Sequence, residues 1–341
     1  MSNVLRAEWE VDGPILMAWP HDDTDWAGML PEVHACYHDI IAAITLDRQV
    51  ILVGPELDSA RKELSDIPAG KVIFFPCPTN DTWTRDYGPV SVEVDGLVSA
   101  VDYKFNGWGL KFAADRDNLV TLRMFAAGLL SGRRINRLSF TLEGGSIDSD
   151  GQGTIITTSE CLLSPNRNGS LTRSEIEQEL KQTLGADRVV WIDNGALAGD
   201  DTDSHVDTLV RFSRSGALLY VGCASEDDPN YASLQAMRSQ LLDLSYQGLL
   251  PKHLIELPSP DPIFDEDGQQ LPATYANFLA TPTAVIMPVY GQKDTDELAE
   301  RILRVAFDLP VRTVDCRALI RQHGSLHCAT MQIPSQLVSF I

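Results

Sequence analysis

PILMAWPHDDTDWAGMLPEVHACYHDIIAAITLDRQVILVG, residues 14–54, contains two apolar runs typical of β-strands, at 15–19 and 50–53. Between them, apolar side chains recur at the spacing of one helix face: Val33, Tyr37, Ile40 and Ile44. A polar cluster, His21 to Asp23, follows the first run. The stretch therefore predicts a unit of strand, helix and strand with polar side chains at one end.

The same order of elements recurs along the chain. Helical spacing marks residues 119–129, 176–184, 234–244 and 298–305, and β-type runs lie at 72–75, 97–103, 153–158, 189–192, 217–222, 284–289 and 311–314. A repeat of about sixty residues suits a closed ring, because one such unit cannot bury both its sheet and its helix. We expect an α/β fold of five units, a five-bladed α/β propeller, with residues 1–341 forming a single domain.

Polar clusters occupy similar positions in successive units, and a ring would bring them to one end of its central channel. We expect Asp86, Glu143, His205 and Cys328 to meet there. The C-terminal residues 328–333 are predicted to form a strand that pairs beside residues 14–19 and closes the ring.

The charge, the apolar runs and the cysteine spacing indicate which partners and which cellular location to expect. The chain has 27 basic and 48 acidic residues, a formal charge of -21, so neither nucleic acid nor an anionic membrane is expected as a partner. A cationic small molecule fits this charge better. Residues 1–13 are acidic where a signal peptide is basic and then apolar, and no apolar run approaches the roughly twenty residues of a membrane span, so we expect a cytoplasmic protein. The six cysteines form no CxxC pair, which favours free thiols.

Several residues are candidates for catalysis or ligand binding because of their type and spacing. Cys328 precedes a predicted strand, where a thiol can project into a cavity, although free cysteines are usually buried and inert. His205 and Asp207 would share one face of a strand and reach a common ligand. Together with Asp86 and Glu143 they would form an acidic cluster that needs a cation, either a metal or a guanidinium.

Two metal alternatives follow from the same residues. His205, Asp207 and the acids of residues 200–203 could bind a divalent ion, as in a metallohydrolase. Residues 148–153 (DSDGQG) imitate the start of an EF-hand loop, but Ser159 stands where that loop has glutamate. We therefore expect a hairpin turn at residues 148–153.

Eight motifs, spread in order over nearly the whole chain, resemble those of the agmatine deiminase family, which belongs with bacterial peptidylarginine deiminases to the pentein superfamily of guanidine-modifying proteins. They are residues 17–20 (MAWP), 83–89 (WTRDYGP), 104–109 (KFNGWG), 142–147 (LEGGSI), 160–168 (ECLLSPNRN), 200–207 (DDTDSHVD), 275–278 (YANF) and 327–332 (HCATMQ).

This resemblance implies a pentein fold and a role for each matching position. Cys328 would be the nucleophile, His205 the general acid and base, and Glu143 its partner. The guanidinium ligands would be Asp86 and Asp207, with Trp83 lining the substrate pocket and packing on its aliphatic tail.

The implied reaction is hydrolysis of agmatine to N-carbamoylputrescine and ammonia, a step of putrescine and polyamine biosynthesis, without metal or other cofactor. The distal amine of agmatine would need another acceptor, Asp203 or Asp201. Free arginine would instead need a cation such as Arg85 or Arg167, and peptidylarginine would need an open cleft. A homodimer follows by family analogy alone, and a catalytically silent pentein would keep the fold without turnover.

The sequence departs from the family pattern beside the proposed nucleophile. Residues 323–327 read HGSLH where agmatine enzymes commonly have a run of the Gly-Gly-Gly-Asn type, and Ser204 takes a position that is often glycine. These differences concern the choice of guanidine substrate rather than the chemistry.

Overall fold

The computed structural model describes residues 3–223 and 225–339, and its strands form five separate sheets within these residues. Two sheets have four strands: β1 (Asn3–Leu5), β5 (Val90–Val94), β6 (Leu97–Lys104) and β7 (Arg133–Thr141); and β17 (Met331–Gln332), β2 (Ile15–Ala18), β3 (Val50–Gly54) and β4 (Val72–Pro76). Three have three strands: β10 (Arg188–Ile192), β9 (Thr154–Thr158) and β8 (Ile147–Ser149); β11 (Val210–Phe212), β12 (Leu218–Val221) and β13 (Leu254–Leu257); and β14 (Leu279–Ala280), β15 (Val285–Val289) and β16 (Val311–Asp315).

All five sheets share one plan, in which a central strand pairs antiparallel with one neighbour and parallel with the other. This regularity agrees with the repeat predicted from the sequence, and the mixed α/β fold is confirmed. The closed five-bladed ring and the single domain stay predictions.

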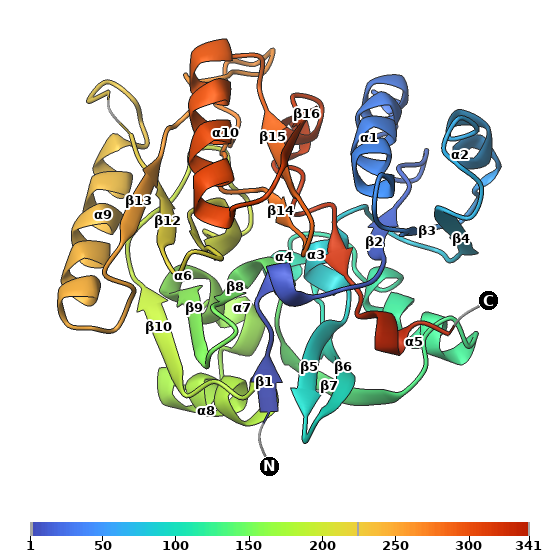
Figure 1. Cartoon of the computed structure of the whole chain (residues 1–341), viewed down its shortest axis with the longest axis horizontal. Helices are drawn as coiled ribbons and strands as arrows, with labels where there is room; N and C mark the ends of the chain where they lie inside the picture. The colour runs from blue at the N-terminus through green and yellow to red at the C-terminus, as the bar shows by residue number, and fades with distance from the viewer. Residues whose placement is uncertain (1–2, 224, 340–341) are drawn as a thin grey trace.

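The helices cover the outside of the sheets. They are α1 (Leu30–Thr45), α2 (Asp58–Glu63), α3 (Thr84–Tyr87), α4 (Gly107–Leu110), α5 (Val120–Ala126), α6 (Ser159–Leu162), α7 (Pro165–Asn168), α8 (Arg173–Leu184), α9 (Tyr231–Tyr246) and α10 (Lys293–Phe307). Figure 1 shows the long helices α1, α9 and α10 at the periphery and the short helix α3 near the centre. All five predicted helices are confirmed, although the predicted segment 119–129 splits into a short 3-10 helix and α5.

Local sequence signals set the ends of helix α8. Thr172 accepts a hydrogen bond from the Glu175 amide, and the Glu175 carboxylate accepts one from the Thr172 amide at 2.7 Å. The helix ends at Gly185, which has a φ of +73° and leaves no room for a side chain, because an added Cβ would meet the carbonyl of Asn3. The capping box and the glycine therefore fix both ends of this helix.

The last strand, β17, pairs with β2 from the first part of the chain. Met331 lies opposite Leu16 and Gln332 opposite Ile15 in an antiparallel pair, which confirms the predicted partner of the C-terminal strand. That strand is shorter than predicted, because Cys328 lies in the turn before it. The hairpin predicted at residues 148–153 is present, with Asp148 and Ser149 at the end of β8 and residues 150–153 forming the turn to β9.

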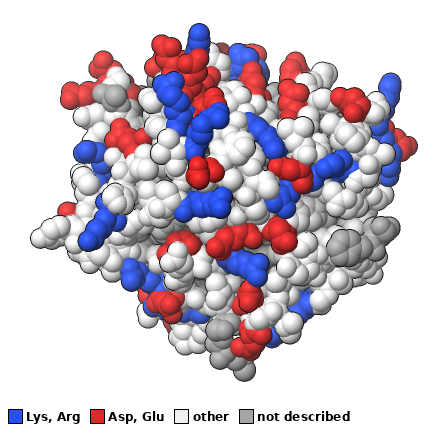
Figure 2. All heavy atoms as spheres, in the orientation of Figure 1, with Lys and Arg blue, Asp and Glu red and all other residues white. Residues whose placement is uncertain are grey.

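The described helices include none that is long and apolar enough to cross a membrane. On the face shown in Figure 2, basic and acidic side chains are interspersed. The net negative charge of the sequence is therefore not gathered into one patch on this face.

Candidate active site

Turns at the ends of strands bring the four predicted residues together. Asp86 lies in helix α3, Glu143 precedes a 3-10 helix (Gly144–Ser146), His205 precedes another (Val206–Thr208), and Cys328 lies in the turn before β17. The expectation that His205 and Asp207 share a strand face is wrong, because Asp207 lies in the 3-10 helix and His205 is the residue that precedes it. Their side chains still point into one cluster, so the predicted convergence is confirmed although its local structure differs.

Gly145 lies at the centre of this cluster. An added Cβ would stand 2.8 Å from both Asp86 Oδ1 and His205 Nδ1, and 3.1 Å from Asp207 Oδ2. The Gly145 amide also donates a hydrogen bond to Asp86 Oδ1 at 2.9 Å. Only a residue without a side chain lets the three groups approach one another this closely.

We expect Gly145→Ala to lower kcat/KM by about 100-fold, because the new methyl group displaces Asp86 and His205 from their positions. Steady-state kinetics with agmatine would measure this loss. Gly28→Ala is the matched control, since an added Cβ there meets no atom within 4 Å. Equal activity of the two variants would show that the cluster is not the reaction centre.

Asp86 is buried, and besides the Gly145 amide two side chains lie beside its carboxylate. The Trp108 indole donates a hydrogen bond to Asp86 Oδ2 at 2.9 Å, and His205 Nδ1 lies 3.6 Å from Asp86 Oδ1. Burial raises the pKa of Asp86 to about 6, an effect that His205 opposes and the nearby Asp207 reinforces. A cation between the two carboxylates would remove their repulsion.

Asp207 has one bonded and one free carboxylate oxygen. Its Oδ2 accepts hydrogen bonds from His327 Nδ1 at 2.7 Å and from Asn277 Nδ2 at 3.3 Å. Its Oδ1 is buried and has no hydrogen-bond partner among the described residues. Burial raises the pKa of Asp207, but the hydrogen bond and the charge of His327 outweigh it, so the pKa lies below its ordinary value. The free oxygen suits a bound N–H donor.

Cys328 is a buried thiol beside these acids. Its Sγ accepts a hydrogen bond from Asn277 Nδ2 at 3.2 Å and lies 3.8 Å from Asp207 Oδ2. Burial, with Asp207 and Asp86 adding to it, raises the pKa of the Cys328 thiol well above its ordinary value. Burial and the neighbouring acids therefore both oppose ionisation of this thiol.

Asn277 is hydrogen-bonded to the residues around the thiol, although the sequence alone does not predict a role for it. Besides donating to Asp207 and Cys328, its Oδ1 accepts hydrogen bonds from the amides of His327 and Cys328. Its place in the polar YANF motif was the available signal.

His205 is fully buried, and neither ring nitrogen has a hydrogen-bond partner among the described residues. Burial lowers its pKa, but Asp86 and Cys161 outweigh burial and raise it well above the ordinary value. Glu143 lies beside this ring, with a carboxylate oxygen within 4.8 Å of an imidazole nitrogen, and Arg167 Nε lies 2.9 Å from both of its oxygens. The buried imidazole is thus free to bind or exchange a proton with a ligand.

The predicted metal ligands do not assemble. Asp200 caps its own loop through Thr202 and Ser204, and Asp203 pairs with Lys111 and Arg167. Among the described residues, the group close enough to share an ion is instead Glu143, Cys161 and His205, with ligand atoms within 4.8 Å of one another. Arg167 already neutralises this Glu143, so the structure gives the metallohydrolase alternative little support.

A cavity of about 130 Å³ leads to the cluster, and Trp83, Asp86, Trp108 and Cys328 are among its lining residues. Trp83 therefore lies where predicted, but Asp203 does not line the cavity because it is bound by Lys111 and Arg167.

Three other acids, Asp25, Asp81 and Asp201, line the same cavity. Burial raises the pKa of Asp81 to about 7, and the charges of Asp25 and Asp201 add to this. The cavity thus has Asp86 beside the thiol and a separate set of three acids, Asp25, Asp81 and Asp201.

Comparisons with known proteins agree with the motifs. Residues 4–334 match the family described as Porphyromonas-type peptidyl-arginine deiminase. A Marinomonas sp. (strain MWYL1) protein named "Putative agmatine deiminase" is 33% identical over 97% of this chain and 94% of its own length.

Two solved structures are similar throughout. A Porphyromonas gingivalis protein described as "Putative Arginine Deiminase" is 42% identical with a TM-score of 0.92, covering 99% of this chain and 100% of that one. A Cys-to-Ser variant of C. jejuni agmatine deiminase with substrate bound is 35% identical with a TM-score of 0.90, covering 96% and 95%. The predicted pentein fold is confirmed by these neighbours.

Proposed function

Because the chain belongs to the Porphyromonas-type peptidyl-arginine deiminase family and is a guanidine-modifying hydrolase, we propose that it hydrolyses agmatine to N-carbamoylputrescine and ammonia. The observation that carries the proposal is a buried thiol, Cys328, beside two buried carboxylates, Asp86 and Asp207. A step in putrescine synthesis is the corresponding cellular role, in the cytoplasm.

The guanidinium binds between Asp86 and Asp207. Its planar N–H groups can donate in pairs to carboxylate oxygens, and Asp207 Oδ1 is free to accept. The bound cation offsets the charges that keep the Cys328 thiol protonated, so binding itself promotes formation of the thiolate.

The reaction then passes through a covalent intermediate. Cys328 Sγ forms a bond to the guanidine carbon, His205 donates a proton to one nitrogen, and the C–N bond breaks to release ammonia. His205, assisted by Glu143, next takes a proton from water, and the resulting hydroxide adds to the carbon of the amidino-thioether. The S–C bond breaks, and the ureido product and Cys328 are released.

The charge of the cavity favours agmatine over arginine. No Lys or Arg is among the described residues that line it, whereas the carboxylate of arginine would need a cation. Arg85 binds Glu8 and Gln332, and Arg167 binds Glu143, so neither is available for that purpose. The acids at Asp25, Asp81 and Asp201 instead suit the distal ammonium of agmatine.

Parallel assays with agmatine, arginine and a peptidylarginine in the presence of EDTA test the proposal. We expect ureido product from agmatine alone. Preference for arginine or peptidylarginine would assign another guanidine. Activity that EDTA abolishes would favour the metallohydrolase, and no turnover of any of the three would favour a silent pentein.

Asp201→Asn should raise KM for agmatine by about tenfold with a smaller change in kcat, because one ammonium contact of roughly 1.4 kcal/mol is lost. Initial rates over a range of agmatine concentrations would measure both constants. Asp22→Asn, an exposed acid outside the cavity lining, is the control. An unchanged KM in Asp201→Asn would place the distal amine elsewhere.

A further inference from the structure

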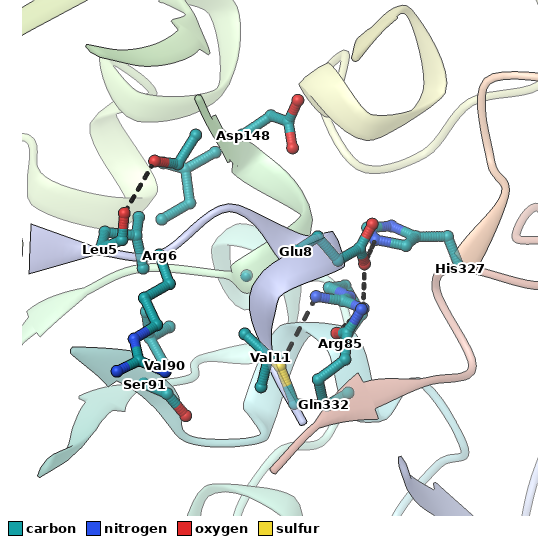
Figure 3. Close-up of a pocket in the computed structure, with 14 residues that line it drawn as sticks. Leu5, Arg6, Glu8, Val11, Arg85, Val90, Ser91, Asp148, His327 and Gln332 are labelled. Atoms are coloured by element: carbon teal, nitrogen blue, oxygen red, sulfur yellow. Dashed lines mark hydrogen bonds and ion pairs between the residues drawn. The ribbon is translucent and has the colours of Figure 1, made fainter. Parts of the chain in front are cut away.

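Glu8 is a buried acid that the reaction described above does not use. It lies on the 3-10 helix Glu8–Glu10, and its side chain is 9% exposed. With Arg85, Asp148 and His327 it lines a second pocket of about 80 Å³. This pocket and the cavity beside Cys328 have no lining residue in common. Figure 3 shows the Glu8 carboxylate between His327 and Arg85.

His327 connects Glu8 to the candidate active site. Its Nε2 lies 2.6 Å from Glu8 Oε1, and its Nδ1 lies 2.7 Å from Asp207 Oδ2. A carboxylate can only accept hydrogen bonds, so both contacts are hydrogen bonds only when both ring nitrogens carry protons. The pair of carboxylates therefore holds an imidazolium ring between them.

Glu8 is itself fixed by cations on other elements. Arg85 Nη2 donates to Glu8 Oε1 at 3.0 Å, and Arg211 Nη2 donates to Glu8 Oε2. Burial opposes the charge of Glu8, but His327, Arg211 and Arg85 lower its pKa well below the ordinary value. Both oxygens of Glu8 are thus bound by cationic side chains, which favour its ionised form.

We propose that Glu8 is a positioning residue for the guanidine reaction, which holds His327 as an imidazolium and through it fixes the orientation and the negative charge of Asp207. The argument rests on the proposed function. Because His327 occupies Asp207 Oδ2, Asp207 Oδ1 is left as the oxygen for substrate. Without the negative charge of Glu8, the doubly protonated form of the His327 ring is no longer stabilised. The hydrogen bond from His327 to Asp207 then weakens.

Glu8→Gln tests the proposal, because glutamine keeps the shape and removes the charge. We expect kcat/KM for agmatine to fall by about 10-fold to 100-fold, mainly through KM, as when a group that orients a ligand is lost. Glu10→Gln on the same helix is the matched control, because that side chain is exposed and only caps the Ala7 amide.

The pH profile separates this role from a structural one. In Glu8→Gln the pH profile of kcat/KM should show the ionisation of Asp207 at higher pH than in the wild type, on the acidic side of the limb set by the Cys328 thiol, since Asp207 becomes harder to ionise. The charged and titratable groups around Asp207 are His327, Cys328, His205, Asp86, Arg211 and Arg85. Those around Glu8 are His327, Arg85, Arg211 and Asp148. All of them remain in the variant.

A spectroscopic measurement on the wild-type protein avoids any risk that the variant misfolds. In ¹⁵N-histidine NMR at the pH of maximal activity, both ring nitrogens of His327 should show the shifts of protonated nitrogen. A neutral His327 ring, or a Glu8→Gln enzyme with unchanged KM and pH profile, would overturn the role of Glu8 alone. A wild-type protein that does not turn over agmatine would overturn this role and the proposed function together.

Discussion

Cys328→Ala is expected to abolish ureido formation from agmatine, with a loss in kcat of at least about 10⁴-fold, because no other thiol lines the cavity among the described residues. Asn277 and Asp207 contact the thiol directly, and the acid Asp86 lies in the same cavity. Ammonia release and ureido product, measured on the same samples, would report the loss.

Two further measurements make this expectation specific. Cys223→Ser, which replaces a buried thiol on a different cavity, should retain activity. In the wild type, the acidic limb of kcat should lie at lower pH than that of kcat/KM. The free thiol has a raised pKa, so it ionises only as the pH rises, and the bound cation lowers that pKa. Full activity of Cys328→Ala would exclude a covalent route through this thiol.

The elements that the sequence predicts best are those whose apolar pattern is strong. Helix α1 and strand β3 have buried faces that local spacing reveals. Strand β7, by contrast, carries arginines along a half-exposed edge, and β14 has two residues, so neither has a pattern to recognise. Their pairing depends on neighbouring strands, which local sequence does not contain.

In the candidate active site, too, local sequence predicts some features and distant contacts decide the others. Short motifs locate Cys328 and His205, because residues needed for chemistry stand beside glycines and turns. The environment of a carboxylate depends instead on distant contacts. The sequence predicts Asp203 as an acceptor for the distal amine, but in the structure its carboxylate forms ion pairs with Lys111 and Arg167. Glu8 lies more than 300 residues from His327 in the chain, so nothing local relates the two.

Arg167→Met is expected to lower the free energy of unfolding by about 3–5 kcal/mol, because it leaves a fully buried Glu143 without its cation. Arg167 also donates to the Thr202 carbonyl at 2.8 Å and to Asp203, so three contacts are lost at once. Urea denaturation of the variant and the wild type would measure the difference.

The double variant Arg167→Met with Glu143→Gln identifies the cause. If the cost is an uncompensated buried charge, removing the charge should restore much of the lost stability, whereas additive losses would point to packing instead. Arg301→Met is the control, since its pair with Glu297 is exposed and its loss should leave stability nearly unchanged. The double variant should remain inactive even where its stability returns, because the proposed reaction requires Glu143 as a carboxylate beside His205. Stability recovered without activity would therefore assign Arg167 the role of keeping an ionised Glu143 in a fully buried position.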